Sequence, residues 1–106
     1  MVIVTETYQL TRQFPREEIY GLTAQIRRAA VSVPSNIAEG QGRRTKGEFV
    51  QFLGNAYGSL LEVETQALIA RELGYLPPET TDAFLEKTAE VGRIVNGLIS
   101  SLTTDN

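Results

Sequence analysis

Residues 25–44 have the sequence Gln-Ile-Arg-Arg-Ala-Ala-Val-Ser-Val-Pro-Ser-Asn-Ile-Ala-Glu-Gly-Gln-Gly-Arg-Arg. On a helical wheel with about 100° per residue, one apolar stripe recurs at spacings of three and four residues, and it consists of Ile19, Leu22, Ile26, Ala30, Val33 and Ile37. The pattern predicts a long second helix from Pro15 to about Gln41, with Pro34 inside it. Because the stripe resumes in phase after Pro34, we expect a kink there rather than a break.

The same spacing argument predicts three further helices, of which one precedes the second helix and two follow it. Residues 2–13 predict a short first helix with Val4, Tyr8 and Thr11 facing inward. Gly40 and Gly42 are expected to end the second helix in the left-handed conformation.

The two remaining helices carry clear apolar stripes. Thr45 and Glu48 predict a capping box that opens a third helix, which Gly74 closes. Its stripe consists of Phe49, Leu53, Ala56, Leu60, Val63, Ala67 and Ala70. A fourth helix starts near Leu76, and its stripe consists of Phe84, Thr88, Val91, Val95, Leu98 and Leu102. Short connections between long helices predict an all-α, antiparallel up-down-up-down four-helix bundle.

The composition limits the chemistry available to the chain. It has 106 residues, enough for one domain spanning residues 1–106, and it has neither cysteine nor histidine. Thiol chemistry, the most common general base and the most common metal ligand are therefore missing. We expect no enzyme activity, no cofactor and no metal. No run of about 18 apolar residues is present and the first residues lack the basic start of a signal peptide, so we expect a cytoplasmic protein without a membrane partner.

The net charge of −3 hides an uneven distribution. Residues 1–46 hold seven basic and four acidic side chains, a net charge of +3, whereas residues 47–106 hold three basic and nine acidic ones, a net charge of −6. Two interpretations stay open at this point. One is a local basic patch that contacts nucleic acid, and the other is a bundle whose two halves pair with each other.

The third predicted helix has more apolar surface than one bundle core requires. A second ridge lies about 100° round the wheel from the first, and it consists of Val50, Tyr57, Leu61 and Leu68. The second helix has a smaller ridge of Tyr20, Val31 and Ala38. We expect these ridges to form an interface between subunits. The alternative is a helix that is buried unusually deeply in its own bundle.

Several segments of the chain together resemble one known family. The main one is residues 21–40, Gly-Leu-Thr-Ala-Gln-Ile-Arg-Arg-Ala-Ala-Val-Ser-Val-Pro-Ser-Asn-Ile-Ala-Glu-Gly. The others are Glu-Phe-Val-Gln-Phe-Leu at 48–53, Ser-Leu-Leu-Glu-Val-Glu-Thr-Gln at 59–66, Leu-Gly-Tyr at 73–75 and Arg-Ile-Val-Asn-Gly-Leu-Ile at 93–99. The chain resembles the 23S rRNA intervening-sequence proteins, also known as the "four helix bundle protein" family.

The resemblance implies a left-handed four-helix bundle that assembles into a homopentamer. Family members are encoded in insertions within bacterial ribosomal RNA genes or stand alone, and for most of them no activity is assigned. Relatives include the accessory protein of diversity-generating retroelements, which binds a reverse transcriptase and nucleic acid. The implied partners are therefore the chain itself, RNA or DNA, and a nucleic-acid enzyme such as a reverse transcriptase. Members usually have several more residues before the position of Met1, so we expect a shortened first helix.

Arg43, Arg44 and Lys46 form the candidate nucleic-acid contact. They flank the predicted Gly-rich turn, where side chains project freely, and each phosphate contact by such a cation adds a salt-dependent increment of affinity. Five copies around a ring would gather these cations into a larger basic patch. The alternative is a solvated turn whose charges pair with Glu39 and Glu48.

Other polar side chains are candidate interface or structural groups. Arg27 lies beside the smaller apolar ridge, and Arg28 points in a different direction. Glu64 falls between the two ridges of the third helix, where an unpaired carboxylate is costly. We expect Glu64 to be partly buried and bonded to Arg27 or Arg28, within one subunit or between two.

A polar ridge on the second helix consists of Gln25, Ser32, Asn36 and Glu39. These side chains either line a groove or bond to the backbone and to neighbouring helices, and we favour the second interpretation. Together with the basic residues near the turn, the family resemblance implies a non-catalytic, oligomeric accessory of nucleic acid or of a ribonucleoprotein. The alternative is a protein-interaction scaffold that does not contact nucleic acid, which the overall acidity favours.

Overall fold

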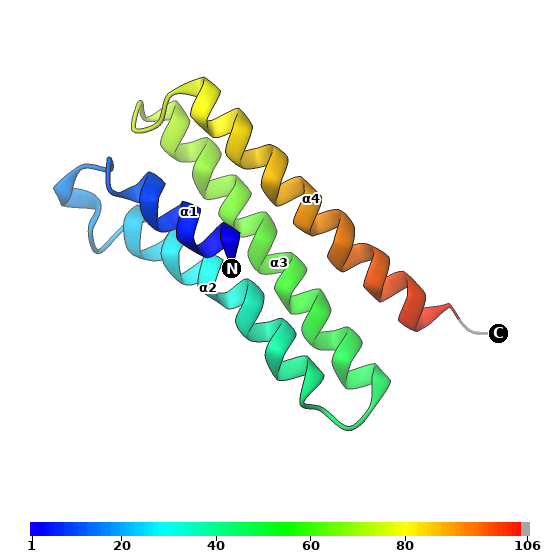
Figure 1. Ribbon diagram of the computed structural model, residues 1–106. Helices are drawn as coiled ribbons and strands as arrows, with labels where there is room; N and C mark the ends of the chain where they lie inside the picture. Colours follow the sequence, from blue (N-terminus) through cyan, green and yellow to red (C-terminus); the bar gives the residue numbers. More distant parts are fainter. Residues whose placement is uncertain (105–106) are drawn as a thin grey trace.

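A computed structural model describes residues 1–104 as four α-helices and one short 3₁₀ helix (Figure 1). The α-helices are α1 (Val2–Thr11), α2 (Leu22–Gln41), α3 (Lys46–Glu72) and α4 (Pro78–Thr103), and η1 (Arg16–Glu18) lies between α1 and α2. Successive α-helices run in opposite directions, which confirms the predicted all-α up-down-up-down bundle. Within residues 1–104, no helix is both long enough and apolar enough to cross a bilayer.

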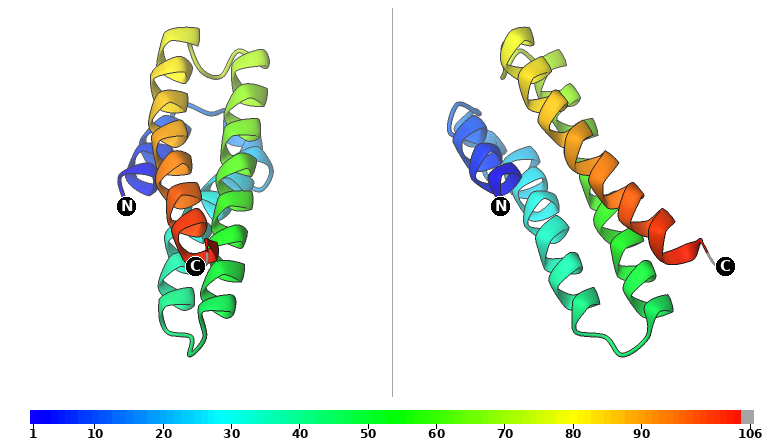
Figure 2. Two further views of the ribbon diagram at one scale, coloured as in Figure 1. Left: turned by 90° about the vertical axis from the view of Figure 1, so that its right-hand side faces the viewer. Right: turned by 45° about the vertical axis from the view of Figure 1, so that its right-hand side comes forward.

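Helix α3 is the central element of the bundle. Its predicted stripe is confirmed from Leu53 onward, because Leu53, Ala56, Leu60, Val63, Ala67 and Ala70 are all buried, whereas Phe49 is only partly covered. At 27 residues and about 1.5 Å per residue the helix is about 40 Å long. It packs against α2 on one side and α4 on the other, so both neighbours are aligned along its length (Figure 2).

The ends of α3 also form as predicted. The backbone N–H of Glu48 donates to Thr45 Oγ1 at 3.1 Å, which caps the first turn. At the other end Gly74 has a φ of 81°, and the N–H of Tyr75 donates to the carbonyl of Ala70 at 2.9 Å. This arrangement requires glycine, since other residues rarely adopt a positive φ. The turn directs the chain back into α4.

The predicted inward face of α1 is confirmed at Thr11 and wrong by one position at Val4 and Tyr8. Ile3, Thr7 and Thr11 are buried, whereas Tyr8 is exposed and Val4 is only partly covered. The two threonines can be buried because each hydroxyl donates to a carbonyl of its own helix, Thr7 to Ile3 at 2.7 Å and Thr11 to Thr7 at 2.9 Å. Internal bonding of this kind is invisible to a wheel that counts threonine as polar.

The predicted start of the second helix at Pro15 is also wrong. Only η1 forms there, and α2 begins at Leu22 after Gly21, whose φ of −108° and ψ of −112° are not helical. The Glu18 carboxylate accepts from the backbone N–H of Leu22 at 3.0 Å and thereby takes the place of a cap. A Cβ on Gly21 would lie 2.8 Å from Glu18 Oε1, so a larger residue there would displace the Glu18 carboxylate. Consequently Ile19 is 54% exposed instead of lying in the core.

Helix α2 continues through Pro34, as the in-phase stripe predicted. It ends at Gln41, also as predicted, but not by a left-handed glycine, because Gly42 has a φ of −82°. Gly40 has a different role from the one expected. A Cβ at this position would lie 2.8 Å from Phe52 Cβ and 2.9 Å from Phe49 Cδ1, so Gly40 allows α2 and α3 to approach closely.

Helix α1 covers only part of the bundle. Figure 1 shows that the N-terminus lies near the middle of the long axis, and that α1 packs beside the first half of α2 only. The larger core cluster lies beneath α1, and its members include Ile3, Ile26, Val63 and Phe84. Beyond the N-terminus the core narrows to Val33, Ala56 and Leu60. A cross-section of the bundle thus contains four helices at the end that α1 covers and three helices, α2, α3 and α4, further along.

Glu18 joins the two connections at the end of the bundle that α1 covers. Its second oxygen accepts from the Tyr75 hydroxyl at 2.8 Å. The bond from Leu22, followed by the bond from Tyr75, lowers the pKa of Glu18 below 4.5. A depressed folded-state pKa stabilises the fold above the unfolded-state pKa, and this contribution is lost as the pH falls through the folded-state pKa.

We therefore expect Glu18→Gln to lower the melting temperature near about pH 7, and we expect this difference to shrink by about pH 3. Circular dichroism melts at both pH values measure the effect. Glu17→Gln is the matched control, since Glu17 is exposed and accepts no side-chain bond within residues 1–104. A difference that stays constant with pH would contradict the role of the carboxylate charge.

Candidate functional site

The turn between α2 and α3 holds the three predicted cations at one end of the molecule. Residues 41–48 are all exposed, and Figure 2 shows the turn projecting at the end away from α1. Arg44 and Lys46 take part in no ion pair within residues 1–104. Lys46 is also the first residue of α3, where unpaired backbone N–H groups and the helix dipole attract anions.

Arg43 differs from its two neighbours. Its Nη2 donates to Glu39 Oε2 at 2.9 Å, and its guanidinium lies 4.7 Å from the centre of the Phe52 ring. The predicted alternative, in which Glu39 neutralises a turn cation, is therefore observed for Arg43 alone. Glu48 bonds to the Thr45 hydroxyl instead of to a cation. Within this turn, Arg44 and Lys46 remain as the cations that can reach a phosphate without breaking an ion pair of residues 1–104.

The two oppositely charged halves of the sequence do not neutralise each other in the structure. Of the ion pairs within residues 1–104, Arg43–Glu39 lies in the first half, and Arg71–Asp82 and Arg93–Glu90 lie in the second. The remaining pair, Lys87–Glu6, joins a basic side chain of the acidic half to an acidic one of the basic half. The excess positive charge of residues 1–46 and the excess negative charge of residues 47–106 are therefore not cancelled by ion pairs between the two halves among residues 1–104.

Arg27 holds α1 against α2. Its Nε donates to Thr11 Oγ1 at 2.8 Å, and its guanidinium lies 4.5 Å from the centre of the Tyr8 ring. These contacts are within one chain. Arg28, in contrast, is exposed and lines a polar depression between α2 and α3 together with Gln25, Glu62 and Gln66.

The polar ridge of α2 mainly makes structural contacts. Asn36 Nδ2 donates to the carbonyl of Ser32 at 2.8 Å and to its hydroxyl at 2.9 Å. Ser59 on α3 donates to the same Ser32 hydroxyl at 2.9 Å. Ser32, which Asn36 also contacts within α2, thus ties α2 to α3, in agreement with the structural interpretation.

Glu64 is partly buried, as expected, but its expected arginine partner is wrong within the chain. Glu64 Oε2 accepts from the Thr88 hydroxyl on α4 at 2.7 Å, and neither Arg27 nor Arg28 contacts it in residues 1–104. The physical reason is its position on the wheel, since this side of α3 faces α4 whereas both arginines belong to α2. Glu64 therefore joins α3 to α4.

The second apolar ridge of α3 is only partly available for an interface. Val50 and Tyr57 are partly covered, and a Cβ on Gly92 of α4 would lie 3.4 Å from Tyr57 Cε1. Leu61 and Leu68 remain 44% and 37% exposed. Tyr20 on the connection before α2 is 94% exposed. Part of the wide apolar arc therefore reflects the central position of α3, as the alternative interpretation stated, and part faces outward.

Two contacts, one at each end of the bundle, were not predicted from the sequence. Phe52 was not recognised as the ring beneath Arg43, although antiparallel pairing of α2 and α3 brings residues on the two sides of the turn together. The bond between Glu18 and Tyr75 joins residues 57 positions apart. No periodic signal indicates that contact.

Comparisons with known proteins agree with this geometry. Residues 1–97 match the family described as 23S rRNA-intervening sequence protein. A crystal structure of a protein of unknown function from the S23 ribosomal protein family of Bacteroides thetaiotaomicron is similar, with a TM-score of 0.85 and 18% sequence identity. The similarity covers 92% of this chain and 88% of that chain, and at this identity it supports the four-helix fold alone. No curated protein matches the sequence.

The Glu64–Thr88 contact gives a second test. We expect Thr88→Val to lower the free energy of unfolding by about 1–3 kcal/mol, because a partly buried carboxylate loses a donor. Chemical denaturation measures the change. Thr65→Val is the control, since the Thr65 hydroxyl is exposed and bonds only to its own helix, at Leu61 O. If Thr88→Val is neutral while Glu64→Ala reduces the molecular mass, Glu64 is held by a neighbouring subunit instead.

Proposed function

The chain belongs to the 23S rRNA-intervening sequence protein family, and on this premise we propose that it is a non-catalytic, oligomeric accessory of RNA or of a ribonucleoprotein. The contact is the turn between α2 and α3. The observation that carries the proposal is the exposure of Arg44 and Lys46 outside any ion pair in residues 1–104, at the start of a 27-residue helix.

Two general physical effects favour phosphate at this turn. The side chains project from the end of the molecule, so they can contact the phosphate backbone of a nucleic acid that is too large to enter a cavity. The α3 dipole adds a partial positive charge near Lys46. Arg43 contributes less, because Glu39 and Phe52 already hold it. An overall charge of −3 opposes binding elsewhere on the surface.

Assembly is the second part of the proposal. Two cations are few for useful affinity, but repeated copies of the turn on one face of a ring act together, since linked contacts raise the effective concentration. We propose the homopentamer that the sequence resemblance implies, with Leu61 and Leu68 in the subunit interface. A reverse transcriptase or another nucleic-acid enzyme is the protein partner that this role suggests.

Titration of a single-stranded RNA of about 20 nucleotides tests the contact. We expect RNA binding to weaken as the salt concentration rises. Arg44→Glu combined with Lys46→Glu should reduce the affinity at least about tenfold. The double variant should also lower the slope of log binding constant against log salt concentration, because each lost phosphate contact removes about 0.7 from that slope. Arg43→Glu has a smaller effect. Arg12→Glu is the control, an exposed cation that lies near the opposite end of the bundle.

Equal losses from Arg12→Glu and from the Arg44 and Lys46 pair would contradict a specific contact at the turn. If the protein assembles but does not bind RNA at low salt, the result would instead favour the other candidate, a scaffold that binds only protein. The exposed Leu61 and Leu68, at 44% and 37%, favour that candidate, since apolar surface of this kind is typical of protein contacts.

Light scattering tests the assembly separately. We expect a pentameric mass for the full chain and a lower mass for Leu61→Glu combined with Leu68→Glu, because buried charges oppose the interface. Ile94→Lys on α4 is the control, since this side chain is 62% exposed and lies on another face. A monomeric mass for the unmodified chain would contradict the ring.

A further inference from the structure

The polar depression between α2 and α3 lies away from the cationic turn. Its volume is about 370 Å³. It is lined by Gln25, Arg28, Ala29 and Ser32 of α2 and by Glu62 and Gln66 of α3. The two helices are tied together at one side of it, because the Ser59 hydroxyl of α3 donates to the Ser32 hydroxyl of α2 at 2.9 Å. The depression is therefore built on two helices that hold each other in place.

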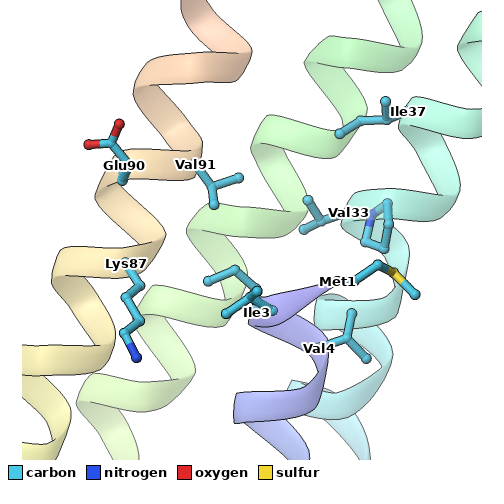
Figure 3. Close-up of a pocket in the computed structure, with 10 residues that line it drawn as sticks. Met1, Ile3, Val4, Val33, Ile37, Lys87, Glu90 and Val91 are labelled. Carbon is cyan, nitrogen blue, oxygen red and sulfur yellow. The ribbon is translucent and has the colours of Figure 1, made fainter.

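A second hollow of the bundle, between α2 and α4, has a different character. Figure 3 shows aliphatic side chains along its walls, among them Val33 and Val91. Its charged side chains, Lys87 and Glu90, both take part in ion pairs with other residues. Neither of them can bind a ligand without breaking its pair. Recognition by hydrogen bonds is therefore expected in the polar depression instead.

The two charged side chains of the polar depression have opposite signs and come from opposite helices. Arg28 and Glu62 are exposed, and neither takes part in an ion pair within residues 1–104. Glu62 repels a simple anion, and Arg28 repels a simple cation. The depression therefore favours a neutral ligand that accepts hydrogen bonds on one side and donates them on the other.

The two helices offer complementary hydrogen-bonding groups to such a ligand. On α2, the Arg28 guanidinium is purely a donor. The Ser32 hydroxyl oxygen accepts from Asn36 and from Ser59, each at 2.9 Å, so its own hydrogen is left to donate. On α3, the ionised Glu62 carboxylate is purely an acceptor. Donors thus lie on the α2 side of the depression and acceptors on the α3 side.

Gln66 adds an acceptor that has no partner. Its Oε1 is covered, yet it accepts no hydrogen bond within residues 1–104. A covered carbonyl oxygen without a donor is energetically costly. The Gln66 side chain as a whole is only partly buried, so rotation about its torsions can turn this oxygen toward the depression. A ligand that donates to Gln66 Oε1 relieves the cost.

We propose that the depression binds an unstacked guanine base of single-stranded RNA, an inference that rests on the RNA contact proposed for the turn. Guanine has two adjacent donors, N1–H and the N2 amino group, which match Glu62 and Gln66 on α3. It also has two adjacent acceptors, O6 and N7, which match Arg28 and Ser32 on α2. Adenine, cytosine and uracil each lack the pair of adjacent donors, so they leave one acceptor of α3 without a partner.

The position of the depression allows one strand to contact both sites. Arg28 and Gln41 lie on the same helix, about 20 Å apart at about 1.5 Å per residue, and the cationic turn follows Gln41 directly. A single strand of several nucleotides spans this distance, so phosphates can bind at the turn while one base enters the depression. Phosphate contacts then supply affinity and the base contact supplies sequence preference.

Two single-stranded RNAs of about 20 nucleotides test the preference, one of uridine alone and one with guanosine at every fourth position. We expect the unmodified protein to bind the guanosine-containing RNA at least about fivefold more tightly. Glu62→Ala should reduce this ratio to about one. Glu72→Ala is the matched control, since it removes the same charge from an exposed position of α3 outside the depression, and it should preserve the ratio. Arg44→Glu combined with Lys46→Glu should weaken both RNAs equally.

Nuclear magnetic resonance of the Gln66 side-chain amide separates the base contact from RNA binding at the turn. Guanosine 5′-monophosphate should shift this amide resonance of the full chain. Adenosine 5′-monophosphate should not, although it carries the same phosphate, because its base lacks the two adjacent donors. The shift by the guanosine nucleotide should disappear in Glu62→Ala and remain in Glu72→Ala.

The possible results separate this inference from the proposed function. A ratio of about one for the unmodified protein, or equal amide shifts by the two nucleotides, would overturn the guanine site and leave the turn contact intact. An amide shift of the same size with glycine would assign the depression to small zwitterions and would also overturn it. A selective shift by the guanosine nucleotide in a protein that binds neither RNA would contradict the turn contact but support the guanine site.

Discussion

The close contact between α2 and α3 is the constraint on which the rest of the structure depends. Gly40 lets the two backbones approach beside Phe52, and the small side chains Ala56, Ala67 and Ala70 are completely buried along α3. Small residues at a helix contact make the packing distance short and intolerant of added volume. Because α3 also carries α4, its position determines where every other helix can lie. The α2–α3 turn is held at the end of this pair.

The helical architecture could be predicted because periodicity reports burial directly. The stripe from Leu53 to Ala70 repeats at three and four residues, and all its core members are buried. The beginning of α2 could not be predicted in the same way, because it depends on a side chain, Glu18, folding back to Leu22. The prediction for α1 is correct at Thr11 but wrong at Val4 and Tyr8, because the burial of Thr7 in their place relies on a bond to its own helix. Local hydrogen bonds of this kind override hydropathy without leaving a periodic trace.

The candidate site could be predicted in part. Three cations around a Gly-rich turn are visible in the sequence, but their different states are not, because Arg43 is distinguished by the Phe52 ring across the turn. Glu64 shows the same limitation. A wheel places it between two faces and implies a partner, but only the arrangement of the helices shows that Thr88 supplies the hydrogen bond. Residues that act across elements need a tertiary structure to be identified.

The bond between Glu18 and Tyr75 has a consequence for motion. It joins the connection before α2 to the turn after α3, so both connections at that end of the bundle are fastened to each other. The opposite end has a solvent-exposed turn and the unflanked end of α4, without a comparable bond between connections in residues 1–104. Local opening should therefore begin at the cationic end, and amide hydrogens there should exchange faster than those beneath α1. We therefore expect the bundle to open less readily beneath α1 than at the exposed turn, so that a partner binding at the turn would also stabilise it.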